Sequence, residues 1–217
     1  MLNFRSIFSI FHCFQGHAYL VDLNTSLIVA TWLAHSLPYV PGEGCEVWSC
    51  SVTPDAQTVV TGGEDGSMKL WDARSKTQIS QSKIFGAGVV FVDFPAENRA
   101  ENQIYTGSYD ENLRVFDRRN LKTVLKEKKA SHPTFFLGQV ICSSPAAFGT
   151  LNKTTRSSSC VCLVCTSGYS ILNSESLDVV YENRDVGKNL LYGATRISRN
   201  STIFCTFNDY LVVLDEF

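Results

Sequence analysis

The sequence predicts an all-β fold built from repeated units, and one recurring segment carries that prediction. Thr61-Gly-Gly-Glu-Asp-Gly-Ser-Met-Lys-Leu-Trp-Asp-Ala-Arg74 recurs as Thr106-Gly-Ser-Tyr-Asp-Glu-Asn-Leu-Arg-Val-Phe-Asp-Arg-Arg119, at a constant offset of 45 residues. Each copy contains a turn with Gly and Asp followed by alternating apolar residues, which indicates a β-hairpin. A period of about 40–45 residues that carries a Trp-Asp dipeptide is typical of a WD-repeat β-propeller blade.

The composition is that of a globular, strand-rich chain. Of its 217 residues, 44% are hydrophobic and 18% are charged, so the chain is long enough to bury a sizeable core. A formal net charge of −2 gives no attraction for nucleic acid or for an anionic membrane, and we expect neither as a partner. No apolar run approaches the roughly 20 residues of a membrane helix, and residues 7–11 are interpreted as a strand rather than a leader peptide.

The eight cysteines follow no disulfide framework. We expect them to be thiols packed as small apolar side chains in a reducing compartment, which predicts a cytoplasmic protein. Cys160, Cys162 and Cys165 are spaced like metal ligands, but on a strand the first two face one side and the third faces the other. The sequence therefore predicts no metal site and no cofactor.

The chain divides into five blades of a single domain over residues 1–217. Residues 1–34 predict a partial blade whose outer strand covers 26–32. Residues 45–84 and 85–130 predict two complete blades, 132–184 a degenerate blade with a polar loop over 143–158, and 188–217 a blade without its outer strand. Because WD-repeat rings commonly have about seven blades, we expect the N-terminal blades of a seven-bladed ring to be missing. The complete ring is expected to be a monomer.

Four residues of the second blade match a polar network that recurs in WD repeats. In such repeats a histidine in the loop entering a blade is hydrogen-bonded with a Ser or Thr, the Trp and the turn Asp. His35, Thr61, Trp71 and Asp65 match these roles in order. Because buried polar groups must be paired, such a network fixes the geometry of the blade, and His35 is interpreted as structural.

The third blade matches this pattern only in part. Thr106 and Asp110 hold the equivalent positions, but Phe116 replaces the Trp and Phe85 stands where the histidine is expected. We therefore expect apolar packing, more than a polar network, to hold this blade. The arginines that follow the turn are expected at a solvated strand end, with attraction of an acidic substrate surface as the alternative; they are Arg114, Arg118 and Arg119.

Several segments, taken in order, resemble the diphthine methyl ester hydrolase family of diphthamide biosynthesis. The resemblance covers roughly residues 17–217. The segments that carry it are Ala30-Thr-Trp-Leu-Ala-His35, Glu46-Val-Trp48, Gly62-Gly-Glu-Asp-Gly66, Trp71-Asp-Ala-Arg74, Ala87-Gly-Val89, the stretch from Thr106 to Arg114, Asp117-Arg-Arg-Asn120, Ser167-Gly-Tyr-Ser-Ile-Leu172, Leu191-Tyr-Gly-Ala194 and the ending from Phe204 to Leu214.

The resemblance implies a cytosolic esterase that needs no cofactor and acts on elongation factor 2. Its substrate there is a modified histidine whose side chain carries a methyl ester. Hydrolysis frees a carboxylate, which a separate ATP-dependent ligase then amidates. The chain as given, with fewer blades than a closed ring, is expected to be weak or inactive. A second function stays open, that of a non-catalytic WD-repeat scaffold which binds partner proteins.

Ester hydrolysis needs a nucleophile or activated water, a base, and donors for the developing oxyanion. The sequence contains neither a Gly-x-Ser-x-Gly elbow nor a His-Glu-x-x-His metal motif. Position along the blade selects Glu46 as the candidate base, beside Trp48 as a ring that binds the modified imidazole. Tyr109, which precedes the turn Asp110, is a further candidate for substrate binding. The alternative is that Glu46 is a solvated loop charge and Trp48 packs the blade.

Overall fold

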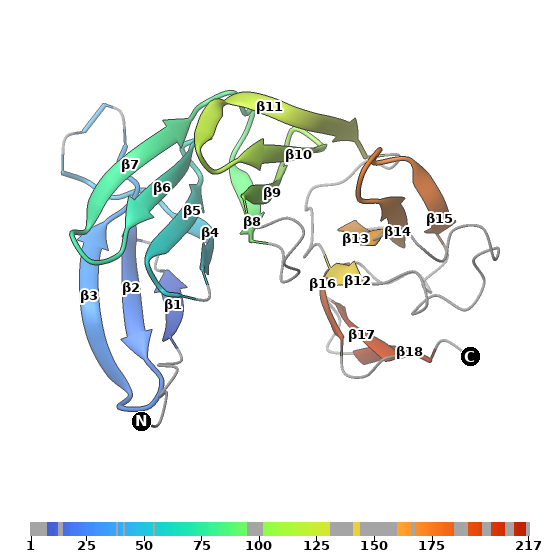
Figure 1. Ribbon diagram of the computed structural model, residues 1–217, viewed down its shortest axis with the longest axis horizontal. Coiled ribbons are helices and arrows are strands. Elements are labelled where there is room, and N and C mark those ends of the chain that lie inside the picture. Colours follow the sequence, from blue (N-terminus) through green and yellow to red (C-terminus); the bar gives the residue numbers. More distant parts are fainter. Residues whose placement is uncertain are drawn as a thin grey trace.

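A computed structural model of the chain shows five antiparallel sheets built from consecutive strands. The structure describes residues 8–12, 15–37, 39–40, 42–53, 55–94, 102–130, 141–143, 160–165, 168–184, 191–196, 201–206 and 211–215. The sheets follow one another along an arc (Figure 1). The predicted all-β fold is confirmed, and no helix among the described residues is long and apolar enough to cross a bilayer.

The first two sheets contain three and four strands. In the first sheet, β2 is the central strand. Its strands are β1 (Phe8–His12), β2 (His17–Asp22) and β3 (Leu27–Leu33). The second sheet has the order β4-β5-β6-β7. Its strands are β4 (Val47–Val52), β5 (Thr58–Gly63), β6 (Met68–Asp72) and β7 (Thr77–Ser82).

The third and fourth sheets each have four strands, and the fifth has three. The third sheet consists of β8 (Val89–Asp93), β9 (Gln103–Ser108), β10 (Asn112–Asp117) and β11 (Asn120–Lys129). The fourth consists of β12 (Ile141–Ser143), β13 (Cys160–Cys165), β14 (Gly168–Asn173) and β15 (Val179–Asn183). The fifth consists of β16 (Leu191–Arg196), β17 (Ser201–Thr206) and β18 (Leu211–Asp215).

Two expectations for the fourth blade fall largely outside the described residues. The start of the degenerate blade predicted over 132–184 lies outside the described residues, which take up this blade at β12. The polar loop predicted over 143–158 also lies outside the described residues, apart from Ser143 at the end of β12.

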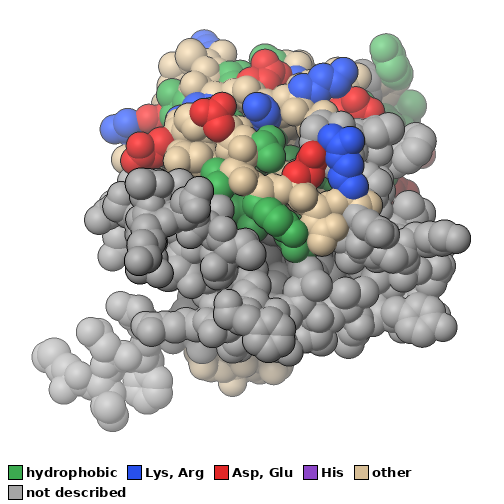
Figure 2. All heavy atoms as spheres, turned by 90° about the vertical axis from the view of Figure 1, so that its right-hand side faces the viewer, with side chains coloured by type: hydrophobic (Ala, Val, Ile, Leu, Met, Phe, Trp, Pro, Cys, Tyr) green, Lys and Arg blue, Asp and Glu red, His purple; other side chains and the backbone are tan. Residues whose placement is uncertain are grey.

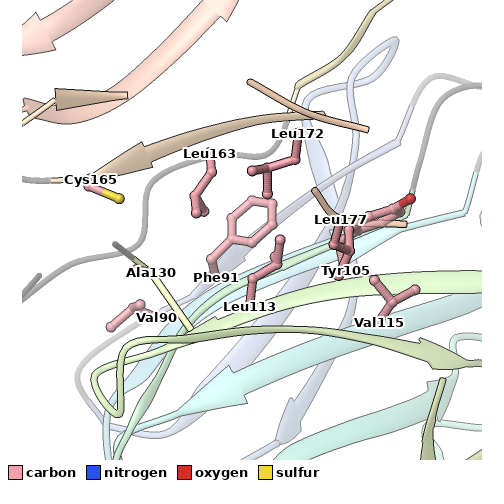
Figure 3. Close-up of a cluster of buried hydrophobic side chains, with 10 residues drawn as sticks. All are labelled: Val90, Phe91, Tyr105, Leu113, Val115, Ala130, Leu163, Cys165, Leu172 and Leu177. Carbon is pink, nitrogen blue, oxygen red and sulfur yellow. The ribbon is translucent and has the colours of Figure 1, made fainter. Parts of the chain in front are cut away.

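The core lies between neighbouring sheets rather than inside any one of them. One cluster of buried side chains joins the first sheet to the second, and another joins the second to the third. A further cluster joins the third sheet to the fourth (Figure 3), where Phe91 and Leu113 lie among Leu163 and Leu172. A single strand-rich sheet cannot cover its own apolar face, so stacking of blades supplies the hydrophobic stabilisation.

A glycine permits the close approach of the second and third sheets. A Cβ atom at Gly62 would lie 2.7 Å from Cγ1 of Val89 and 2.9 Å from the carbonyl oxygen of the same residue. Side chains avoid such distances, and here one of the two obstacles is backbone. The glycine of the repeated Thr-Gly pair therefore serves packing between blades, in addition to its place near the turn.

Candidate functional site

The structure brings together the three residues that the sequence selected for catalysis and substrate binding. Glu46 immediately precedes β4, Trp48 lies in β4, and Tyr109 follows β9 in the next blade. The indole Nε1 of Trp48 donates a hydrogen bond to Oε2 of Glu46 at 2.8 Å. The rings of Trp48 and Tyr109 meet edge to face, with centroids 5.1 Å apart and planes at 79°.

Gly88, which the sequence did not single out for this site, determines where the Trp48 ring can lie. A Cβ atom at this position would approach Cζ3 of Trp48 to 2.1 Å, so the ring packs directly on the backbone of the third blade. The carbonyl of Gly88 also accepts a hydrogen bond from the amide of Tyr109 at 3.1 Å. Gly88 thus positions both aromatic residues, and the only sequence signal for it was its place in the segment Ala87-Gly-Val89.

The carboxylate of Glu46 is held on one side and open on the other. Its Oε2 atom is occupied by the indole of Trp48, and within the described part of the chain Oε1 has no hydrogen-bond partner. Glu46 is half-buried, and its carbonyl accepts the amide of Glu64 at 2.9 Å, which ties it to the turn between β5 and β6. A carboxylate oriented in this way can accept a proton from a water molecule.

One ring donates a hydrogen bond to this carboxylate, and the second ring packs against the first. Trp48 is half-buried and packs against the core cluster between the third and fourth sheets. Tyr109 is 40% exposed, so the corner opens to solvent on its side. Aromatic faces at near right angles suit a flat ring or a cationic group. We call Glu46, Trp48 and Tyr109 the acidic aromatic corner.

The polar network of the second blade connects His35 with three other side chains. His35 is fully buried, and its Nδ1 lies 2.9 Å from Oδ1 of Asp65. Its Nε2 lies 2.8 Å from Oγ1 of Thr61, which in turn accepts the indole N–H of Trp71 at 2.9 Å. This arrangement is structural, because every partner is buried or half-buried in the blade interface.

The direction of these hydrogen bonds follows from their donors. The indole of Trp71 can only donate, so the hydroxyl of Thr61 is left to donate to Nε2 of a neutral His35. Nδ1 of His35 then carries the proton and donates to Asp65. Burial lowers the pKa of His35 and so favours the neutral ring. The hydrogen bond to Asp65 acts in the opposite direction but is the smaller effect. Burial alone would raise the pKa of Asp65, but hydrogen bonds from His35 and Ser67 lower it to about 2.

We expect the free energy of unfolding to fall as the pH drops below neutrality. Both groups bind a proton more readily in the unfolded chain, His35 below its ordinary pKa of about 6.5 and Asp65 below about 4. The His35 contribution is lost first, and the Asp65 contribution is lost as the pH falls from about 4 toward 2. Denaturant unfolding at a series of pH values measures this slope. An unchanged slope in a His35→Gln variant would contradict the assignment of the first step to His35.

An arginine that the sequence placed at a solvated strand end is buried in the third blade. Arg114 is 6% exposed, and its guanidinium lies over the ring of Phe85 at 5.3 Å from the centroid. It pairs with Asp110 at 2.8 Å and with Glu127 at 2.7 Å. The expectation of a solvated Arg114 is therefore wrong, because Phe85 leaves the turn aspartate without a histidine and Arg114 takes its place.

The third blade combines this ion pair with apolar packing. Oδ2 of Asp110 accepts the amide of Gly86 at 2.9 Å, and Thr106 donates to the carbonyl of Arg114 at 3.2 Å. Phe116 is fully buried, and its ring lies 5.9 Å from that of Phe85. The predicted apolar packing is present. The sequence analysis did not predict the ion pairs of Arg114, which give this blade a polar network as well.

The other two arginines of this segment differ from Arg114. Arg118 is half-buried, and its Nε donates to Asn102 at 3.0 Å. Arg119 is exposed and pairs with Asp117. Acidic and basic side chains are mixed over the described part of the face in Figure 2.

The described part of the chain contains no cluster of side chains that could bind a metal ion. No three His, Cys, Asp or Glu side chains described by the structure come close enough to hold a metal ion. Burial raises the pKa of the Cys50 and Cys165 thiols to about 12, so both are protonated near neutral pH. The side chains of Cys160 and Cys162 lie outside those described.

The fold and its repeat define the class of protein. Residues 29–72 match the family described as WD domain, G-beta repeat, and this range contains the whole His35 network. Together with the repeated antiparallel sheets, the match shows a WD-repeat fold, with the matched repeat lying in the first two sheets.

Several characterised proteins are similar to parts of the chain. Diphthine methyltransferase of Saccharomyces cerevisiae is 40% identical over 81 residues, which cover 34% of this chain and 21% of the relative. Diphthine methyltransferase of Homo sapiens is 31% identical over 101 residues, covering 46% and 20%. Mitotic checkpoint protein bub3 of Dictyostelium discoideum is 35% identical over 82 residues, covering 36% and 22%. The matched segments thus span about a fifth of the length of these relatives.

Proposed function

We propose that this WD-repeat protein hydrolyses the methyl ester of methylated diphthine on elongation factor 2, in the cytoplasm. The observation that carries the proposal is the acidic aromatic corner, where a half-buried carboxylate bonds to the ring of Trp48, which packs against the ring of Tyr109 from the next blade. Two of the similar proteins are named diphthine methyltransferase, which supports a role in methyl chemistry on diphthine.

The corner suits hydrolysis because the carboxylate can act on water. In the proposed step, Glu46 accepts a proton as the water oxygen attacks the ester carbonyl carbon. The tetrahedral intermediate then collapses, and the departing methoxide takes the proton from Glu46 and leaves as methanol. Trp48 and Tyr109 hold the modified imidazole by ring contacts, while the indole hydrogen bond keeps the carboxylate oriented.

Methanol release is the test of this function. The protein, in excess over elongation factor 2 carrying methylated diphthine, is expected to release methanol without ATP or added metal. Single-turnover conditions make even slow hydrolysis measurable, so the proposal requires a detectable rate from this chain even though its blades are fewer than those of a closed ring. Absence of methanol under conditions where the two proteins bind each other would contradict the proposal.

A second candidate function is a scaffold that binds proteins without catalysis. The similarity to mitotic checkpoint protein bub3 favours it, since that match covers a share of the chain comparable to the yeast diphthine methyltransferase match. The same assay separates the two functions. Binding of elongation factor 2 without loss of its methyl ester supports the scaffold, whereas methanol release supports the hydrolase.

A further inference from the structure

The carboxylate of Glu46 has no positively charged partner among the residues that the structure describes. Its Oε2 atom accepts a hydrogen bond from a neutral indole at 2.8 Å, and no described lysine, arginine or histidine pairs with it. The turn aspartate Asp110 of the third blade differs, because it pairs with Arg114 at 2.8 Å. A half-buried carboxylate without a cation leaves a negative charge that a ligand can offset.

The charged side chains next to the corner do not supply the missing positive charge. Glu64, whose amide donates to the carbonyl of Glu46 at 2.9 Å, is itself acidic and exposed. In the third blade, beyond Tyr109, the basic side chain of Arg114 is already paired with Asp110 and is only 6% exposed. The charge of the corner therefore favours a cation over a neutral molecule of the same shape.

The two aromatic rings of the corner suit a cation that carries apolar groups. Aromatic faces attract a cation placed over them, and tryptophan does so most strongly. Trp48 and Tyr109 meet edge to face with centroids 5.1 Å apart, and Tyr109 is 40% exposed, so a ligand can reach the rings from solvent. Rings also contact methyl and methylene groups well. An organic cation whose charge is spread over carbon-bound groups combines both features.

We propose that the acidic aromatic corner is a binding site for such an organic cation. The rings contact the apolar atoms of the cation, and the carboxylate of Glu46 offsets its charge. Oε2 of Glu46 stays bonded to the indole of Trp48, which holds the carboxylate in place while the ligand binds. Two kinds of ligand share this chemistry, an alkylated imidazolium ring and an alkylated ammonium group.

For the proposed hydrolase, this inference means that the modified histidine enters the corner with a positive charge. That assignment of the natural ligand rests on the proposed function, whereas the preference for a cation does not. Oε1 of Glu46 remains open for the water molecule of the hydrolysis. The preference is a property of the corner, so it can be measured on this chain without elongation factor 2.

Titration of the ¹⁵N-labelled 217-residue chain with paired small molecules tests the proposal, followed by the indole N–H resonance of Trp48. One pair is dimethylimidazolium and neutral N-methylpyrazole. The other is choline and its neutral isostere, in which carbon replaces the quaternary nitrogen. Each cation is expected to saturate the shift in about the millimolar range and to bind roughly fivefold or more tightly than its neutral counterpart. The tighter cation shows whether the corner suits a flat ring or a tetrahedral group.

Three variants identify the groups that recognise the cation. Glu46→Gln is expected to weaken cation binding by roughly fivefold or more and to leave binding of the neutral counterparts unchanged, because the amide keeps the indole contact and removes only the charge. Tyr109→Leu is expected to weaken binding of both cations by removing one ring. Glu64→Gln, the matched control, removes the same charge from an exposed neighbour and is expected to change the affinity by less than about twofold.

Equal binding of the cations and their neutral counterparts would overturn the proposal. So would an unchanged cation affinity in Glu46→Gln, whose amide spectrum shows whether it is folded. Selectivity for the cations without methanol release would contradict the proposed hydrolase and support the cation site. Methanol release without that selectivity would support the hydrolase and overturn the cation site.

Discussion

Trp71→Ala is expected to lower the free energy of unfolding by about 3–5 kcal/mol. The indole is 6% exposed in the cluster that joins the first two sheets, and its ring centroid lies 6.1 Å from that of Trp32. Truncation removes this packing and takes the donor from Thr61 in the His35 network. Denaturant unfolding followed by circular dichroism measures the loss.

The control for Trp71→Ala is a change on the exposed turn after β6. Lys76 is exposed, and only its backbone amide is fixed, by the carbonyl of Asp72. Lys76→Ala is therefore expected to change the free energy of unfolding by less than about 0.5 kcal/mol. Similar midpoints for the two variants would show that Trp71 does not hold the blade interface.

Glu46→Gln is expected to slow methanol release by roughly 10²–10⁴-fold. The amide cannot accept a proton from water, but its carbonyl oxygen can still accept the indole hydrogen bond of Trp48. The corner therefore keeps its shape while losing its base. The single-turnover rate of the variant, compared with that of the unchanged protein, gives the effect.

Glu64→Gln removes the same charge from a neighbouring residue and serves as the control. Glu64 is exposed, and its contact with Glu46 is made by its backbone amide. The rate of methanol release by Glu64→Gln is expected to stay within about twofold of that of the unchanged protein, because a surface charge has no direct part in the reaction. Full activity in Glu46→Gln would refute this residue as the base.

The sequence predicted one hairpin in the second blade and one in the third, because the two segments are copies of each other. The first hairpin corresponds to β5 and β6, and the second to β9 and β10. The turn between the second and third strands of each copy supplies strong local signals, so the register of both hairpins follows from short-range rules. In the fourth blade no such repeat guided the prediction.

The partners of Arg114 could not be read from the repeat. The copy in the second blade has Lys69 at the same position, where its Nζ donates to the carbonyl of Ala34 at 2.9 Å. A local pattern assigns a charged residue at this point to the solvent. Only the replacement of the histidine by Phe85 in a different segment creates space for a buried guanidinium. Such a substitution affects a residue in a different segment, and hydrophobic periodicity cannot predict an effect between distant positions.

The acidic aromatic corner was predictable in its members but not in its contacts. Position before and within the first strand of a blade selected Glu46 and Trp48, and position before the turn aspartate selected Tyr109. The contact between Trp48 and Tyr109 joins two blades, so it depends on how the blades stack. That stacking in turn requires a residue without a Cβ atom at Gly88. Nothing in a single sequence indicates that this glycine has such a role.

The indole N–H resonance of Trp48 provides the most direct test that substrate binds at the acidic aromatic corner. The chain has three tryptophans, and Trp32 and Trp71 are both buried between the first two sheets. In ¹⁵N-labelled protein, a peptide carrying the methyl ester of diphthine is expected to shift the Trp48 resonance and leave those of Trp32 and Trp71 in place. Binding of the peptide with an unmoved Trp48 resonance would contradict the account.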